Sequence, residues 1–156
     1  MVEIGNKLES EGFDVFLDWY APGKDTDDFW RDYTKARGRT YIQALKEPAA
    51  THVFNFDYHY LSKADTVVLL LPAGKSCHLE FGWAIGKGKK GYILFDSIPE
   101  RYDIMYKFAT DLFMNIEDLI KELNRAKTLK MIVYPERKER DVEDSNIDEG
   151  VPCNVE

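Results

Sequence analysis

Residues 66–95 read TVVLLLPAGKSCHLEFGWAIGKGKKGYILF, and this stretch decides the fold. Its first six residues, Thr66–Leu71, are β-branched or apolar without interruption, which is typical of a strand buried on both faces. After a Pro-Ala-Gly-Lys turn, Ser76 can cap a helix that runs to about Ile85, where two glycines end it. Gly91–Phe95 then has the composition of a second buried strand. Strands that alternate with helices predict a mostly parallel sheet that helices cover on both sides.

The rest of the chain is expected to add helices and short strands to this unit. The pattern predicts helices over Val2–Glu11, Phe29–Lys46, Ala49–Ser62, Tyr102–Thr110 and Ile116–Arg125, strands over Phe13–Leu17 and Met131–Tyr134, and a loop over Asp18–Asp28. Gly12 is placed to end the first helix, Gly38 weakens the second, and Pro48 breaks it. The predicted fold is therefore an α/β three-layer sandwich of the flavodoxin or Rossmann-like kind, with a mostly parallel sheet.

The length of 156 residues favours one folded domain, which we assign to residues 1–134. From Pro135 onward charged residues dominate and large apolar side chains are few. Such a segment cannot bury enough apolar surface to fold, so residues 135–156 are expected to form a disordered tail.

Composition and charge exclude several classes of protein. The net charge of -7 argues against broad binding to a nucleic-acid backbone, which needs a basic face. No run of about 18 apolar residues is present, so no membrane span is expected, and the polar N-terminus is unlike a secretory signal. With two cysteines, three histidines and no Cys-x-x-Cys pair, neither a disulfide framework nor a structural zinc site is expected. The expected location is cytoplasmic.

Ligand sites in such α/β folds lie beyond the carboxyl ends of the strands, which draws attention to Pro72–Glu80. Its Gly74-Lys75-Ser76 triplet is similar to part of a phosphate-binding P-loop, but that motif needs a glycine five positions earlier, where Leu69 stands. A helix N-terminus still attracts anions, and Lys75 and Ser76 would add donors for a 5′-phosphate or 5′-hydroxyl. A capped helix with an exposed lysine explains the same spacing.

Glu80 lies one turn into this predicted helix, between Leu79 and Phe81. A charged residue at this position is compatible with a solvated helix face. It is equally compatible with a carboxylate held near the strand ends, where a sugar could reach it. Carboxylates serve as covalent nucleophiles at anomeric carbons, so the second interpretation points to glycosyl chemistry.

The segment is more specific as a whole than in its parts. It reads Ala64-Asp65, an apolar strand, and then GKSCHLEFGWAIGKGK over residues 74–89. This string resembles the nucleoside 2-deoxyribosyltransferase family and its relatives that hydrolyse nucleoside 5′-monophosphates. The resemblance runs from about Val2 to Leu123 and is most specific between Asp57 and Leu94.

The resemblance implies roles for individual residues. The family's nucleophilic glutamate falls on Glu80, and its second active-site carboxylate falls on Asp57, which would hold or protonate the base or sugar. Burial that raised the Asp57 pKa would suit that role. Gly74 and Ser76 would bind the sugar or its 5′ group, and Asp65 would be structural. The implied reaction uses a small nucleoside or nucleotide and no metal or cofactor, and the implied assembly is a homodimer or larger oligomer.

The chain departs from the family pattern at two places. Family transferases often carry an aspartate six residues before the nucleophile, where this chain has Gly74, and a serine in the loop is similar to the monophosphate hydrolases. The family also begins with a strand and a Gly-Ser-type loop, whereas this sequence starts at the following helix. Because the first strand is central in a flavodoxin-like order, we expect either an upstream start or a gap that another strand or a neighbouring chain fills.

Aromatic residues fall into two groups with different expected roles. Trp19 and Tyr20 follow a predicted strand, where they could stack on a nucleobase or cover the core. The spacing of a second group indicates core or subunit contacts: Phe29, Trp30, Tyr33 and Tyr41. His78 points differently from Glu80 on the helix, so it is expected to support the site indirectly.

Three functions are compatible with the sequence. The first is cleavage of an N-glycosidic bond, with transfer of the sugar to another base or to water. The second is a nucleotide-binding sensor of the same fold that has lost catalysis. The third is a flavodoxin-like scaffold of another class, which would bind a flavin.

Overall fold

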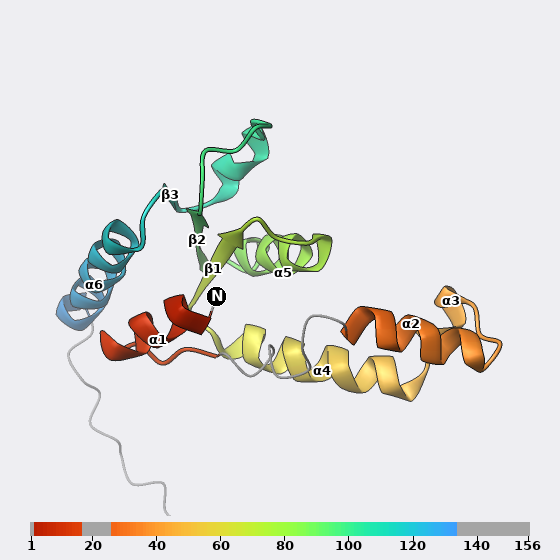
Figure 1. Ribbon diagram of the computed structural model, residues 1–156. Coiled ribbons are helices and arrows are strands. Elements are labelled where there is room, and N and C mark those ends of the chain that lie inside the picture. Colours follow the sequence, from red (N-terminus) through yellow and green to blue (C-terminus); the bar gives the residue numbers. More distant parts are fainter. Residues whose placement is uncertain (1, 17–25, 134–156) are drawn as a thin grey trace, which may run out of the picture.

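A small parallel sheet lies at the centre of the computed structural model, which describes residues 2–16 and 26–133 (Figure 1). Its strands, in spatial order, are β1 (Thr66–Leu71), β2 (Lys90–Phe95) and β3 (Asp111–Phe113). β1 and β2 pair in parallel along their full lengths, and β3 pairs in parallel with the middle of β2. The predicted α/β class and parallel sheet are confirmed.

Helices cover both faces of the sheet. α5 (Lys75–Gly86) packs on one face, and α1 (Val2–Ser10) and α6 (Ile116–Val133) pack on the other. The arrangement is consistent with a flavodoxin or Rossmann-like sandwich. Because β1 and β2 are covered on both sides, their uninterrupted apolar sequences are explained.

The core on the α5 face is built from Leu69 of β1, Ile93 of β2 and Phe81 of α5. Gly91 makes this close approach possible, since a Cβ at that position would lie 2.9 Å from the Phe81 ring and 2.9 Å from Ile85. Full burial of an aliphatic or aromatic side chain contributes about 1.5–3 kcal/mol, so this cluster fixes α5 firmly to the sheet.

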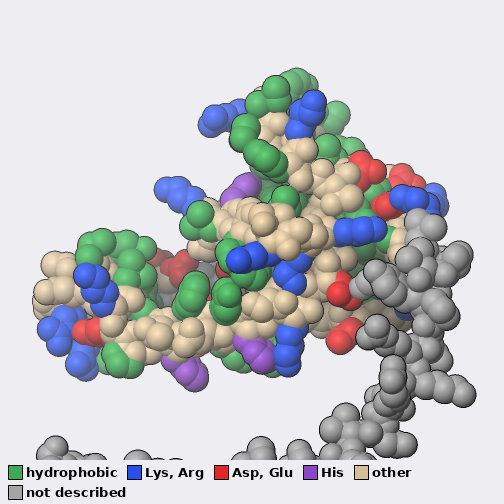
Figure 2. Space-filling view, turned by 180° about the vertical axis from the view of Figure 1, so that it is seen from behind, with side chains coloured by type: hydrophobic (Ala, Val, Ile, Leu, Met, Phe, Trp, Pro, Cys, Tyr) green, Lys and Arg blue, Asp and Glu red, His purple; other side chains and the backbone are tan. Residues whose placement is uncertain are grey.

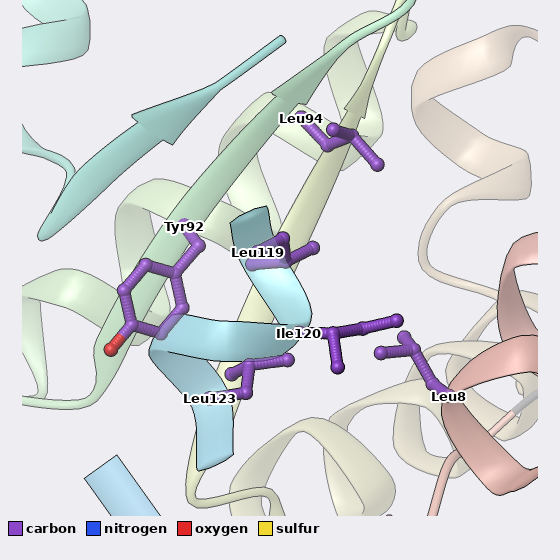
Figure 3. Packing of buried hydrophobic residues seen from close by; sticks show 6 residues of the cluster. All are labelled: Leu8, Tyr92, Leu94, Leu119, Ile120 and Leu123. Atoms are coloured by element: carbon purple, nitrogen blue, oxygen red, sulfur yellow. The ribbon is translucent and has the colours of Figure 1, made fainter. Parts of the chain in front are cut away.

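The core on the opposite face is larger and is shown in Figure 3. It consists of six buried side chains: Leu8, Tyr92, Leu94, Leu119, Ile120 and Leu123. In Figure 3, α6 directs three of them toward the sheet, and Leu8 of α1 approaches Ile120. Tyr92 and Leu119 are fully buried, so the middle of β2 is enclosed on this face.

Three further helices form a helical arm that extends away from the sheet (Figure 1). They are α2 (Thr26–Ala36), α3 (Tyr41–Ala44) and α4 (Pro48–Lys63). None of the 16 residues of α4 is buried. Among the described strands β1 pairs with β2 alone, so one edge of β1 is open.

The arm changes two sequence predictions. The single helix predicted over 29–46 is divided into α2 and α3 at Gly38, whose φ of +64° is a left-handed conformation that glycine adopts readily. A capping box between Thr40 and Gln43 then begins α3. Three of the four aromatic residues expected at core or subunit contacts are not core residues, since Phe29 is 71%, Tyr33 54% and Tyr41 63% exposed, whereas Trp30 is half-buried.

The predicted strand over residues 13–17 is also wrong where the structure describes it. Residues 13–16 follow α1 and Gly12 without entering the sheet. Phe13 and Val15 pack instead against the core between the sheet, α1 and α6, and Phe16 stacks on Tyr60 of α4. The apolar side chains of this alternating pattern are therefore partly buried, but the backbone pairs with none of the three strands.

The C-terminal half contains three more corrections. The helix predicted over 102–110 is only a 3₁₀ helix, η2 (Ile104–Phe108), and β3 after it was not predicted. Residues 131–133, predicted as a strand, continue α6, because a helix docked on the sheet can propagate through β-branched residues.

Tyr134, Leu17 and the tail 135–156 lie outside the described residues. None of the helices in residues 2–16 and 26–133 could cross a bilayer, being too short or too polar.

Candidate active site

Glu80 is placed by the turn that joins β1 to α5. Gly74, in an extended conformation, is the N-cap of α5, so the helix begins at Lys75 and Glu80 lies in its second turn. The prediction that Ser76 caps this helix is wrong, because Ser76 already lies inside the first turn. The N-cap residue is Gly74, and no side chain forms a capping hydrogen bond there. Phe81, next to Glu80, is buried against the sheet and fixes the rotation of the helix.

Asp57 comes from a different element, the C-terminal half of α4. Two contacts hold this half of α4 near α5. Tyr58 meets Trp83 of α5 edge-on, with 5.2 Å between ring centroids. At the end of α4, the Lys89 ammonium donates to the carbonyl oxygens of Ser62 and Ala64, as cations often do at helix C-termini.

The charge of Asp57 acts on the carboxyl group of Glu80. Burial raises the pKa of Glu80, and the neighbouring negative charge of Asp57 raises that pKa further. Burial also raises the pKa of Asp57. Much of the Glu80 residue remains exposed to solvent, whereas Asp57 is half-buried. The structure thus brings together the two carboxylates that the sequence singled out, with enough protein around them to disfavour two charges and enough access for a ligand.

The first turn of α5 lies beside this pair and is open to solvent. Gly74, Lys75 and Ser76 are all exposed. Free N–H groups at the start of a helix, together with the Lys75 ammonium and Ser76 hydroxyl, can receive an anionic or hydroxylated group. Among the described residues, none would lie within 4 Å of a Cβ added at Gly74.

An aromatic pair that the sequence analysis missed borders the same side of α4. Phe16 and Tyr60 stack with ring centroids 3.8 Å apart and planes 10° apart, and Phe56 meets the Tyr60 ring at 5.0 Å. Tyr60 lies three residues after Asp57 and therefore on the same helix face. The i, i+3 spacing of Asp57 and Tyr60 could have indicated from the sequence that Tyr60 lies near the site. The contact of Phe16 with Tyr60 is visible only in the folded chain.

The structure describes only some of the other predicted site residues. Trp19 and Tyr20 lie outside the described residues, so their predicted stacking role stays a prediction. His78 contacts Gly74 and Tyr106, which fits a supporting role away from the carboxylates. Within residues 2–16 and 26–133, no three His, Cys, Asp or Glu side chains are grouped to hold a metal ion.

Comparison of the chain with protein-family models and with curated protein sequences finds no match. Fold and site together therefore define a class of protein only. It is an α/β protein with an open parallel sheet, in which one carboxyl group on the helix after the first strand is influenced by a second on a neighbouring helix.

Proposed function

We propose that this protein cleaves the N-glycosidic bond of (deoxy)nucleosides or nucleoside 5′-monophosphates. Glu80 acts as the nucleophile, and the (deoxy)ribosyl group passes to another base or to water. The observation that carries the proposal is the electrostatic coupling of Glu80 with Asp57, two carboxyl groups supplied by separate helices. Paired carboxyl groups in unlike environments are the usual machinery for chemistry at an anomeric carbon.

In the proposed reaction the ionised Glu80 carboxylate attacks C1′ while protonated Asp57 donates its proton to the departing base. The bond from C1′ to the base nitrogen breaks, and an ester between the sugar and Glu80 forms. Water or a second base then attacks C1′ from the opposite side and releases Glu80, with Asp57 accepting the proton from that nucleophile. Burial raises the pKa of Asp57, which favours the protonated form that this step requires of the proton donor.

The surroundings of the pair support a nucleoside as the substrate. The exposed first turn of α5, with Lys75 and Ser76, suits a 5′-phosphate or 5′-hydroxyl. The stacked rings of Phe16 and Tyr60 offer an apolar surface of the kind on which nucleobases stack.

The test is to incubate the protein with deoxynucleosides and nucleoside monophosphates, with and without an acceptor base, and to follow free base by chromatography. Glu80→Ala and Asp57→Asn should each abolish most base release. Glu9→Gln, an exposed carboxylate on α1, is the matched control and should have no effect. Full activity in Glu80→Ala, or no base release from any nucleoside, rejects the mechanism.

The open edge of β1 favours one alternative, a nucleotide-binding protein of this fold without turnover. An open strand edge leaves the β1–α5 turn less firmly supported, and catalysis tolerates a loosely held group less well than binding does. This alternative predicts that nucleotides raise the melting temperature while no base appears. The same chromatographic assay, run beside a thermal shift, separates the two functions.

The helical arm supports the proposal of a homo-oligomer. Figure 2 shows hydrophobic side chains on the surface of the arm. The large hydrophobic residues that are exposed on the arm are Phe29, Tyr33, Tyr41, Ile42, Leu45, Val53, Phe54, Phe56 and Tyr58. Exposed apolar side chains that are grouped on one part of a surface mark association sites. In a second copy of this chain the same patch would pair with itself about a two-fold axis.

A further inference from the structure

Hydrogen bonds link α5 to the segment between β2 and β3. His78 places Nδ1 2.8 Å from the Gly74 carbonyl oxygen and Nε2 3.2 Å from the Tyr106 hydroxyl oxygen. The two rings lie nearly parallel, with planes 20° apart. Tyr106 belongs to η2, and its ring meets Phe95 at the end of β2 edge-on at 5.9 Å. His78 thus connects the N-cap of α5 to a segment that follows the next strand.

These partners define which nitrogen of His78 carries the proton. A carbonyl oxygen only accepts, so Nδ1 must donate to Gly74. In a neutral ring Nε2 is then an acceptor, and the Tyr106 hydroxyl donates to it. The Nδ1–H tautomer therefore satisfies both contacts at once, and each partner helps to orient the ring.

His78 and Glu80 lie on opposite flanks of α5. Successive residues of an α-helix are about 100° apart, so residues two positions apart differ by about 200°. Phe81 faces the sheet between these flanks. Trp83, on the Glu80 flank, contacts Tyr58 of α4. α5 consequently contacts the sheet through Phe81, η2 through His78 and α4 through Trp83.

We propose that His78 is a positioning residue for the reaction: bridging Gly74 and Tyr106, it holds the start of α5 so that Glu80 stays opposite Asp57. The inference rests on the proposed function. A displacement of about 1 Å in a reacting group can cost on the order of 100-fold in rate. Partial release of the helix by loss of one hydrogen bond is expected to lower kcat about tenfold. KM stays within about twofold, because Glu80 acts on the bond that breaks.

The kinetic test uses variants that remove the same bond from its two ends. Tyr106→Phe removes only the hydroxyl, and His78→Asn keeps a donor near the Nδ1 position but loses the group that meets Tyr106. Each should lower kcat about tenfold, and the double variant should be no slower than either single one. Tyr102→Phe, in the same segment and 83% exposed, is the matched control and should keep wild-type kcat. Unchanged kcat in Tyr106→Phe and His78→Asn, or additive losses in the double variant, overturns the proposal.

A second readout needs no substrate. Nitrogen NMR of the His78 side chain should show the Nδ1–H tautomer in the wild-type protein and a shifted Nε2 resonance in Tyr106→Phe. An Nε2–H tautomer overturns the proposal. If the wild-type protein releases no base, the proposed function fails and this inference with it. If it releases base and Tyr106→Phe keeps full kcat, only the inference fails.

Discussion

The sheet with its covering helices and the helical arm are packed in different ways. β1 and β2 lie between two apolar cores, with Tyr92 and Ile93 fully buried. The arm buries only Ala44 and Thr34 among its described side chains, and α4 buries none. One region is therefore stable through its own packing, whereas the other presents apolar surface that residues 2–16 and 26–133 leave uncovered.

The candidate site lies where these two regions meet. Glu80 is carried by α5, which belongs to the packed region, and Asp57 by α4, which belongs to the arm. The relative placement of the two carboxyl groups consequently depends on few contacts, chiefly Tyr58 with Trp83 and Lys89 with the end of α4. Sites built between a rigid scaffold and a less stable element are common, because such elements can adjust to a ligand.

The largest expected effect is on activity and is confined to the boundary between the regions. Glu80→Gln should lower base release by at least about 10³-fold, because the amide cannot form the glycosyl ester. The variant should fold normally, since Glu80 is exposed and its burial-raised pKa shows that a charge there is unfavourable. Chromatography of free base and circular dichroism check the two statements. If the variant loses its fold together with its activity, Glu80 is required for folding and the loss of activity says nothing of a nucleophile.

The next effect compares the packing of the two regions directly. Ile93→Ala should lower the free energy of unfolding by about 2–5 kcal/mol, because it opens a cavity in a fully enclosed site. Phe54→Ala in the arm should change it by less than about 0.5 kcal/mol in the monomer, since Phe54 is 64% exposed. Urea unfolding at low protein concentration measures both. Equal losses would mean that the arm is packed as tightly as the sheet.

A charge on the arm tests whether a second copy covers it. Phe54→Glu should weaken the homo-oligomer by about 2 kcal/mol, roughly thirtyfold in its dissociation constant, as a central contact of an interface does. Analytical ultracentrifugation over a range of concentrations provides the measurement. The Glu9→Gln variant on α1 serves as the control. A chain that is monomeric at all concentrations, before and after the change, contradicts the proposed assembly.

Lys89 offers a smaller change at the junction itself. Lys89→Met removes the donor to the carbonyl oxygens of Ser62 and Ala64 and should cost about 1 kcal/mol of stability. It should also lower activity, because the C-terminal end of α4, the helix that carries Asp57, loses its hydrogen bonds to Lys89. Lys63→Met, an exposed lysine on the same helix, controls for the loss of charge. Thermal unfolding and base release report the two effects, and identical behaviour of both variants would argue against the attachment.

The smallest expected effect is on the pH dependence of stability. Both Asp57 and Glu80 have raised pKa values in the folded chain, so folding favours their protonated forms. Their destabilising contribution is absent below the unfolded values of about 4 and grows as pH rises through the folded pKa values. The stability gain of Glu80→Gln over the wild-type protein should therefore increase with pH in this range. Denaturant unfolding at a series of pH values measures it, and a gain that shrinks with pH would contradict the direction of both shifts.

Local sequence was sufficient for the elements that are buried on both sides. The predicted strand Thr66–Leu71 has the observed bounds, and the second strand differs by one residue, because continuous apolar runs are compatible with little else. Gly12 ends α1 as predicted, with a φ of +80° that few other residues adopt. Glu80 and Asp57 could also be singled out, since a family resemblance marks residue types at fixed spacing.

Tertiary structure decided what depends on partners distant in the sequence. Residues 13–16 have a strand pattern, yet they do not pair with the open edge of β1, and no local pattern could indicate this. β3 is only three residues long and exists because β2 offers it an edge. The coupling of Asp57 with Glu80 and the bond between His78 and Tyr106 each join separate elements, so they follow from how helices dock on the sheet and not from any local pattern.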